Sequence, residues 1–286
     1  MMRKVAVVVD SIAKMPPDVL AEYDITALPF HISMGGKDYL DTTINKDLLY
    51  SRLMSKELPT VAPPSPGEMA EAFRKMSQRA KAILYITMTS RFSGEYERVT
   101  GVKKSIELEL PGVVVEAVDS LTITCAEALI TIEAAKAAGE GKSLPEVAEI
   151  TRQVVQRVSA LSVRDSLYYF DKSGRMGKER PLAGSPVPLA PVMEIDAATG
   201  GVTQAVSKHR TVAKALENML EIMKERSANK KLYVMLGHLY KPDTAEELKA
   251  KILSEFQPAR FHLTELSPVA AIMNGPYIDL AFFTED

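Results

Sequence analysis

The stretch Leu84-Tyr85-Ile86-Thr87-Met88-Thr89-Ser90-Arg91-Phe92-Ser93-Gly94 joins an apolar run to a cluster of hydroxyl side chains. The apolar part begins at Ala82 and is too short for a helix of ordinary length. It therefore predicts a buried strand of a parallel sheet over residues 82–88. From Glu95 to Leu108 the apolar residues have helical spacing, which places Ser93 and Gly94 at a helix N-terminus.

This corner between a strand and a helix is a candidate anion site. The first N–H groups of a helix have no partner within the helix, and the helix dipole favours negative charge there. Ligands of open α/β sheets bind at the carboxyl ends of the strands, where Ser93 is predicted to lie. The simpler interpretation is that Ser93 only caps its helix, because caps are commoner than ligand sites.

Composition restricts the classes of function. The chain has 286 residues and a net charge of −2, so it is long enough for two domains and has no basic surface typical of nucleic-acid-binding proteins. Its single cysteine, Cys125, lies in an apolar helical run, which excludes an intrachain disulfide and favours a cytoplasmic protein. The first apolar run, Val5–Val9, is too short for a signal peptide or a membrane span, so we expect no integral membrane segment.

Strands and helices alternate over residues 1–155. Two further strands, Val5–Val9 and Val113–Val118, end in Asp-Ser pairs, and a capping box with proline predicts a helix over residues 66–80. The run Ile25–Ile32 predicts a strand at an edge or a bend because it contains Pro29. A small hairpin-like excursion is expected around residues 29–60. This half is therefore predicted to be a parallel βα sheet domain.

Residues 156–286 have a different pattern and predict an α+β domain. Its predicted strands are Ser166–Tyr169, Pro191–Ile195, Val202–Val206 and Leu232–Leu239, and its predicted helices are Val212–Arg226 and Thr244–Phe256. The polar, glycine-containing segment 171–178 predicts an exposed turn. The fold class is therefore α/β with two domains, an N-terminal parallel sheet domain and a C-terminal α+β domain.

Several kinds of active site are excluded. The sequence has no dinucleotide-binding glycine motif, no phosphate-binding loop and no nucleophile elbow. The four histidines are far apart and none has a partner four residues away, so no metal site is expected. A nucleophilic Ser93 would need a neighbouring base, and Glu95 is predicted to be an acid at a helix start, favoured by the dipole. We therefore expect no catalytic residue and no cofactor.

Seven short motifs, in their order and spacing, resemble those of the DegV family of bacterial fatty-acid-binding proteins. They extend over nearly the whole chain: Val8-Val9-Asp10-Ser11, residues 63–68 (PPSPGE), residues 89–96 (TSRFSGEY), Val118-Asp119-Ser120, Lys172-Ser173-Gly174-Arg175, Lys208-His209-Arg210 and Gly275-Pro276.

The resemblance implies a two-domain, DegV-like protein that holds one long-chain fatty acid in an apolar tunnel. It places the carboxylate near the domain junction, where a separate fatty-acid kinase subunit can phosphorylate it to an acyl phosphate. Carried over by motif, Ser93 is the carboxylate donor and Arg175 is the basic residue of the head-group region. Hydroxyl donors at a helix N-terminus suit a carboxylate, and an apolar cavity suits an acyl chain.

The sequence departs from the family pattern at the head-group site. Val61-Ala62 stand where the family has Thr-Ser, and Met273 stands where it often has a histidine. Three explanations stay open: Thr60 or Thr89 supplies a replacement donor, the ligand has a less polar head group or a different register, or the changes are ordinary packing variation.

Two other functions are compatible with the sequence. One is a hydrolase or phosphatase that uses Ser93 as its nucleophile. The other is a lipid-sensing regulatory module that has no kinase partner.

Overall fold

Three β-sheets organise the fold in the computed structural model, which describes residues 4–55, 58–185, 187, 189–227 and 230–285. The first sheet has four parallel strands in the order β2-β1-β6-β7. Its strands are β1 (Val5–Asp10), β2 (Ile25–Leu28), β6 (Ala82–Thr87) and β7 (Val114–Asp119). The predicted parallel sheet is therefore confirmed, with the run 82–87 as a central strand.

Helices cover both faces of this sheet. The outer face packs against α3 (Pro66–Ser77) and α4 (Glu95–Glu109). The capping box predicted at the start of α3 is present, because Ser65 N donates to Glu68 Oε2 (2.8 Å) and Glu68 N donates to Ser65 Oγ (3.3 Å). The predicted helix 66–80 is three residues too long at its C-terminus. The short helix α1 is Pro17–Tyr23.

A small antiparallel sheet follows, in the order β4-β3-β5. Its elements are β3 (His31–Met34), β4 (Lys37–Leu40), α2 (Lys46–Met54) and β5 (Thr60–Ala62). The run 25–32 is not a single strand, because Pro29 separates β2 from β3, but β2 does lie at an edge of the parallel sheet, as expected. Phe30 N donates to Ser11 Oγ and to Asp41 Oδ1 (both 3.0 Å), so this amide is bonded to side chains instead of continuing a β-ladder.

The third sheet has six strands in the order β10-β9-β8-β13-β11-β12, and β11 pairs in parallel only with β12. Its strands are β8 (Ser159–Arg164), β9 (Ala190–Glu194), β10 (Gln204–His209), β11 (Lys231–Leu239), β12 (Arg260–Glu265) and β13 (Tyr277–Glu285). Its outer face packs against α8 (Val212–Ser227) and α9 (Pro242–Phe256). The expected α+β character of this half is confirmed.

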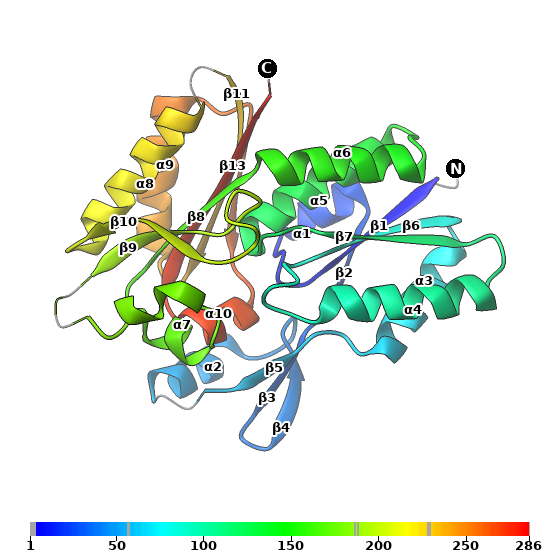
Figure 1. Ribbon diagram of the computed structural model, residues 1–286, viewed down its shortest axis with the longest axis horizontal. Coiled ribbons are helices and arrows are strands. Elements are labelled where there is room, and N and C mark those ends of the chain that lie inside the picture. Colours follow the sequence, from blue (N-terminus) through cyan, green and yellow to red (C-terminus); the bar gives the residue numbers. More distant parts are fainter. Residues whose placement is uncertain (1–3, 56–57, 186, 188, 228–229, 286) are drawn as a thin grey trace.

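Helices α5 (Thr124–Gly139) and α6 (Leu144–Arg157) lie between the two large sheets (Figure 1). Helix α5 contacts β1 of one sheet and β11 and β13 of the other, and nearly all of its side chains are buried. Small residues allow this close approach: a Cβ on Gly237 of β11 would lie 2.6 Å from Cys125 Sγ. The two large sheets and the helices on their faces thus form five layers, helices and sheets in turn, and the small sheet lies outside this stack (Figure 1).

Other predictions for the second half need correction. The strand predicted over Ser166–Tyr169 is wrong, because the chain forms helix α7 (Tyr168–Lys172) there. Ser166 Oγ accepts from Tyr168 N (3.2 Å), and Tyr169 Oη donates to Leu53 O (3.1 Å), so side-chain bonds fix a helical turn. The strand predicted over 202–206 begins two residues later, at Gln204, after the Gly200-Gly201 turn.

Segment 171–178, predicted as an exposed turn, contains the end of α7 and the start of the 3₁₀ helix η1 (Gly177–Leu182). A further helix, α10 (Pro268–Asn274), precedes β13. Among the described helices, none combines the length and apolar character needed to span a bilayer. The division of the chain into two domains at residue 155 stays a prediction.

Candidate functional site

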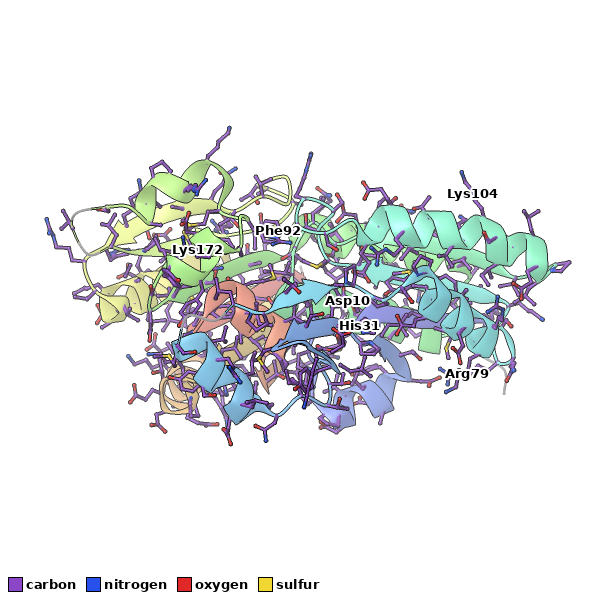
Figure 2. All side chains as sticks on the ribbon, turned by 90° about the horizontal axis from the view of Figure 1, so that it is seen from below. Asp10, His31, Arg79, Phe92, Lys104 and Lys172 are labelled. Atoms are coloured by element: carbon purple, nitrogen blue, oxygen red, sulfur yellow. The ribbon has the colours of Figure 1, made fainter. Side chains whose placement is uncertain are left out.

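The carboxyl ends of β1, β6 and β7 meet at one edge of the parallel sheet, as their polar residues predicted. Asp10 accepts hydrogen bonds from Ile12 N (2.8 Å) and Met88 N (3.0 Å), and Asp119 accepts from Ser90 N (3.2 Å). These bonds to backbone amides fix the loops that follow the strands. Figure 2 shows Asp10 and Phe92 near the middle of the molecule.

A cavity of about 160 Å³, called here the first cavity, lies at this edge. Its walls are mainly apolar, and its polar side consists of Ser93, Gly94, Arg98 and Arg175. The apolar residues that line it are Ile12, Phe30, Val61, Pro63, Met88, Phe92, Val269 and Met273. The cavity thus brings together the strand ends, α4, α10 and the loop that follows α7.

A larger cavity of about 360 Å³, the second cavity, adjoins the first. The two share Val61, Arg175 and Met273 as lining residues. The other residues of the second cavity are Leu58, Pro59, Thr60, Lys172, Ser173 and Ile272. The two cavities are therefore neighbours, and their lining residues extend from the Ser93 corner to α7 and β5.

The structure brings most of the predicted site residues to these cavities. Ser93 lines the first cavity, Thr60 lines the second, and Val61, Arg175 and Met273 line both. Two predicted residues line neither. They are Ala62, which is exposed on β5 opposite His31, and Thr89, which is buried and donates to Gly201 O (3.0 Å).

Ser93 lies just before the first turn of α4, whose N-cap residue is Gly94. The Ser93 hydroxyl oxygen accepts a long hydrogen bond from Glu95 N (3.3 Å). This bond uses a lone pair of the oxygen, so the hydroxyl hydrogen stays available to donate. Ser93 can therefore support the helix start and donate to an anion at the same time.

Arg98 is a lining residue that the sequence analysis missed. Its Nη1 donates to the carbonyl oxygens of Pro63 (3.2 Å) and Pro64 (2.9 Å), which links α4 to the loop before α3. Arg98 is one helical turn after Gly94 and therefore lies on the same face of α4 as the corner. That spacing is the signal in the sequence that could have indicated it.

Glu95 lies in the first turn of α4, where an acid was expected. Its side chain is completely buried and accepts from Tyr85 Oη (2.8 Å). Burial, followed by the negative charge of Asp10, raises the pKa of Glu95 well above its usual range. Burial and Asp10 likewise raise the pKa of Glu127, and burial raises the pKa of Asp10 itself.

A buried carboxylate ties α10 to the strand ends. Asp41 accepts from Ser11 Oγ (2.8 Å) and from Ser267 Oγ (2.7 Å), the N-cap residue of α10. These bonds hold the helix that carries Val269 and Met273 against the first cavity. Within the part of the chain that the structure describes, no group of three or more histidine, cysteine, aspartate and glutamate side chains is arranged to hold a metal ion.

Comparison with known proteins identifies a family. The model of a family described as DegV, an uncharacterised protein family, matches residues 4–284. A DegV domain-containing protein of Caldanaerobacter subterraneus is 27% identical over 286 residues, which cover 99% of this chain and 100% of the relative.

Solved structures share the fold. A structure described as fatty acid binding of a DegV family protein from Thermus thermophilus has a TM-score of 0.88 at 22% identity, covering 99% of this chain and 100% of that chain. A stearic-acid-binding protein from Eubacterium ventriosum has a TM-score of 0.86 at 22% identity, covering 99% and 98%. These comparisons confirm the resemblance drawn from the motifs and the predicted fold class.

Proposed function

Because the chain belongs to the DegV family, we propose that it binds one long-chain fatty acid, with the carboxylate at the Ser93 corner and the acyl chain against the apolar walls of the cavities. The observation that carries this proposal is the composition of the first cavity. Its lining combines donors for an anion, among them Ser93, Arg98 and Arg175, with apolar side chains.

The chemistry of the two ends of a fatty acid supports this assignment. A carboxylate is stabilised by charge-assisted hydrogen bonds, and the Ser93 hydroxyl, the N-terminus of α4 and the Arg175 guanidinium are suitable donors. An acyl chain needs contact with apolar groups, which Phe30, Met88 and Val269 offer.

The size of the cavities is compatible with such a ligand. The volume of the second cavity alone, about 360 Å³, lies within the roughly 300–1,000 Å³ usual for small-molecule sites. Two solved proteins of the same fold are described by their fatty-acid ligands. We therefore assign the first cavity to the head group and the second cavity, with the apolar core beside it, to the acyl chain.

The surroundings of Ser93 favour binding over hydrolysis. A nucleophilic serine needs a base within hydrogen-bond reach. The described side chains that line the first cavity with Ser93 are apolar, apart from the two arginines, and Ser93 Oγ accepts from a backbone amide. An arginine cannot act as the base, because it stays protonated.

We also propose that the bound carboxylate is presented to a separate fatty-acid kinase subunit in the cytoplasm. Support comes from the family resemblance and from the exposed Gly94 and the half-buried Arg175, which line the first cavity. The alternative is a lipid sensor without a kinase. Capture experiments with the loaded protein distinguish them, because only the first function requires a kinase that transfers phosphate to the bound acid.

The test of fatty-acid binding is mass spectrometry of an organic extract of the denatured protein. We expect about one fatty acid per chain, and rebinding of added fatty acid after delipidation. A clean extract combined with no uptake of added fatty acids would contradict the proposal. Hydrolysis of acyl or phosphoryl esters that survives careful purification and is lost in Ser93→Ala would instead favour the hydrolase.

A further inference from the structure

Two arginines, Arg98 and Arg175, line the first cavity. Within the described residues, neither forms an ion pair with a carboxylate. Arg98 Nη1 donates to two proline carbonyls, and Arg175 Nη1 donates to Ser173 O (2.5 Å). Two positive charges thus face a small cavity whose remaining walls are mostly apolar.

Arg98 is fixed in place but still has unused donors. Both hydrogens of Nη1 are accounted for by Pro63 O and Pro64 O. The Nε–H and the two hydrogens of Nη2 have no partner among the described residues, and this edge of a guanidinium matches the two oxygens of a carboxylate. Because one edge of the guanidinium group is already held by hydrogen bonds, the side chain loses little conformational entropy when the other edge binds a ligand.

Two acids lie close to Arg98 in the sequence, Glu95 and the exposed Glu97, and among the described residues neither forms an ion pair with it. Glu95 is completely buried behind the corner, and its hydrogen bond is to Tyr85. Burial and the neighbouring Asp10 raise its pKa, and Arg98 opposes this rise only as a smaller effect. The positive charge of Arg98 is therefore available to an anion in the cavity.

The rest of the cavity offers an anion few other donors. Val61 and Met273 are apolar, and Ser93 is the one hydroxyl side chain among the described lining residues. Arg98 lines only the first cavity and comes from the same helix as Gly94, whereas Arg175 lines both cavities. Arg98 is therefore the cation that belongs specifically to the Ser93 corner.

We propose that Arg98 binds the carboxylate of the fatty acid through its Nε–Nη2 edge and determines the preference of this protein for an ionised head group. This inference rests on the proposed function, because it names a residue of the same site. The competing explanation is structural: Arg98 only ties α4 to the loop at Pro63 and Pro64.

The experiment compares two ligands that differ only in charge, palmitate and methyl palmitate, on the delipidated full chain. In Arg98→Gln we expect the affinity for palmitate to fall about 10- to 100-fold, the range for a lost hydrogen bond to a charged group. The affinity for methyl palmitate should change less than about twofold, because the ester carries no charge. Glutamine can still donate to the proline carbonyls, so the loop contact is largely kept.

The matched control is Arg91→Gln, which removes the same charge from an exposed arginine on the same corner. It should leave both affinities unchanged. Equal losses for the acid and the ester in Arg98→Gln would overturn the inference, because a purely structural role affects both ligands. Unchanged affinity for palmitate would overturn it as well.

A second variant, Arg98→Lys, tests the inference if Arg98→Gln folds poorly. Arg98→Lys keeps the positive charge but lacks the paired N–H groups of the guanidinium edge. We therefore still expect a loss of affinity for palmitate alone. An equal loss of affinity for both ligands would contradict the inference. Failure of the proposed function has a different signature, because the wild-type chain would then bind neither palmitate nor its ester.

Discussion

The Thr89 hydroxyl donates a hydrogen bond to the carbonyl oxygen of Gly201, with 3.0 Å between Oγ1 and O. Thr89 follows β6 of the parallel sheet, and Gly201 precedes β10 of the six-stranded sheet. A residue considered as a replacement ligand donor therefore joins the two halves of the chain. Gly201 has φ +74°, and a Cβ there would lie 2.5 Å from Thr89 Oγ1.

This contact predicts a loss of stability without a loss of ligand affinity. Gly201→Ala should lower the free energy of unfolding by at least about 1 kcal/mol, because alanine is strained at positive φ and its Cβ meets Thr89. Thr89→Val should lower it by about 1 kcal/mol through the lost hydrogen bond. Thermal melts measure both effects, and a marked drop in fatty-acid affinity of Thr89→Val would show that Thr89 does act at the site.

Ser93→Ala tests the head-group site directly. We expect carboxylate binding to weaken by about 1.5 to 3 kcal/mol, the range for a hydrogen bond to a charged group, while the fold is kept. If Ser93 acts only at the helix start, the melting temperature should fall by the equivalent of about 1 kcal/mol and the affinity should stay unchanged. One titration and one melt distinguish the two results.

Val61→Thr tests whether the cavity has been adapted to a less polar ligand. Val61 lines both cavities, and its position is fixed by pairing with Ile32 in the small sheet. The threonine hydroxyl adds a donor at nearly constant volume, so we expect tighter binding of palmitate with little loss of stability in the loaded protein. Weaker binding, or destabilisation by roughly 1 to 3 kcal/mol, would show that no carboxylate lies within reach of residue 61.

Asp196 predicts a dependence of stability on pH. Burial, followed by repulsion from Glu194, raises the pKa of Asp196 from 3.8 to about 6. Its contribution to stability is therefore complete below about pH 4 and is lost as the pH rises through about 6. Asp196→Asn should be more stable than wild type above pH 6, by at most about 3 kcal/mol, and the difference should vanish near pH 4.

Melting curves across this pH range measure the difference for Asp196. The asparagine side chain can still accept from Ala198 N, which keeps the turn before Gly200. Glu225→Gln, which changes an exposed acid on α8, is the control and should show no such pH dependence. A constant difference between Asp196→Asn and wild type at all pH values would rule out this titration.

Much of the fold could be predicted because local chemistry and tertiary structure agree. The Ser143/Glu146 capping box starts α6 as its sequence indicates, with Ser143 N donating to Glu146 Oε2 (2.7 Å). The three polar strand ends also converge as expected, because parallel strands must end at one edge of their sheet. These features depend on a few neighbouring residues or on topology alone.

The features that sequence reasoning missed depend on contacts between distant segments. Residues 166–169 have the composition of a strand, yet they form a helical turn. Tyr169 donates there to the carbonyl oxygen of Leu53 in α2, more than a hundred positions earlier in the chain. Glu95 has the sequence context of an exposed acid, and only the packing of α4 on β6 buries it beside Tyr85. The sequence around Arg98 is typical of an exposed position on a helix. Arg98 lines the cavity because its side chain donates to the loop at Pro63 and Pro64, a contact that exists only in the folded chain.

Helix α5 belongs to the core of both large sheets at once. Detachment of either sheet would expose the face of this helix that the sheet covers, and neither half would keep a complete core. Cooperativity in unfolding should therefore extend over the whole chain, even though the sequence pattern changes near residue 155. In differential scanning calorimetry this corresponds to a single endotherm whose calorimetric and van't Hoff enthalpies agree, whereas two resolved endotherms would mean that α5 remains folded on one sheet alone.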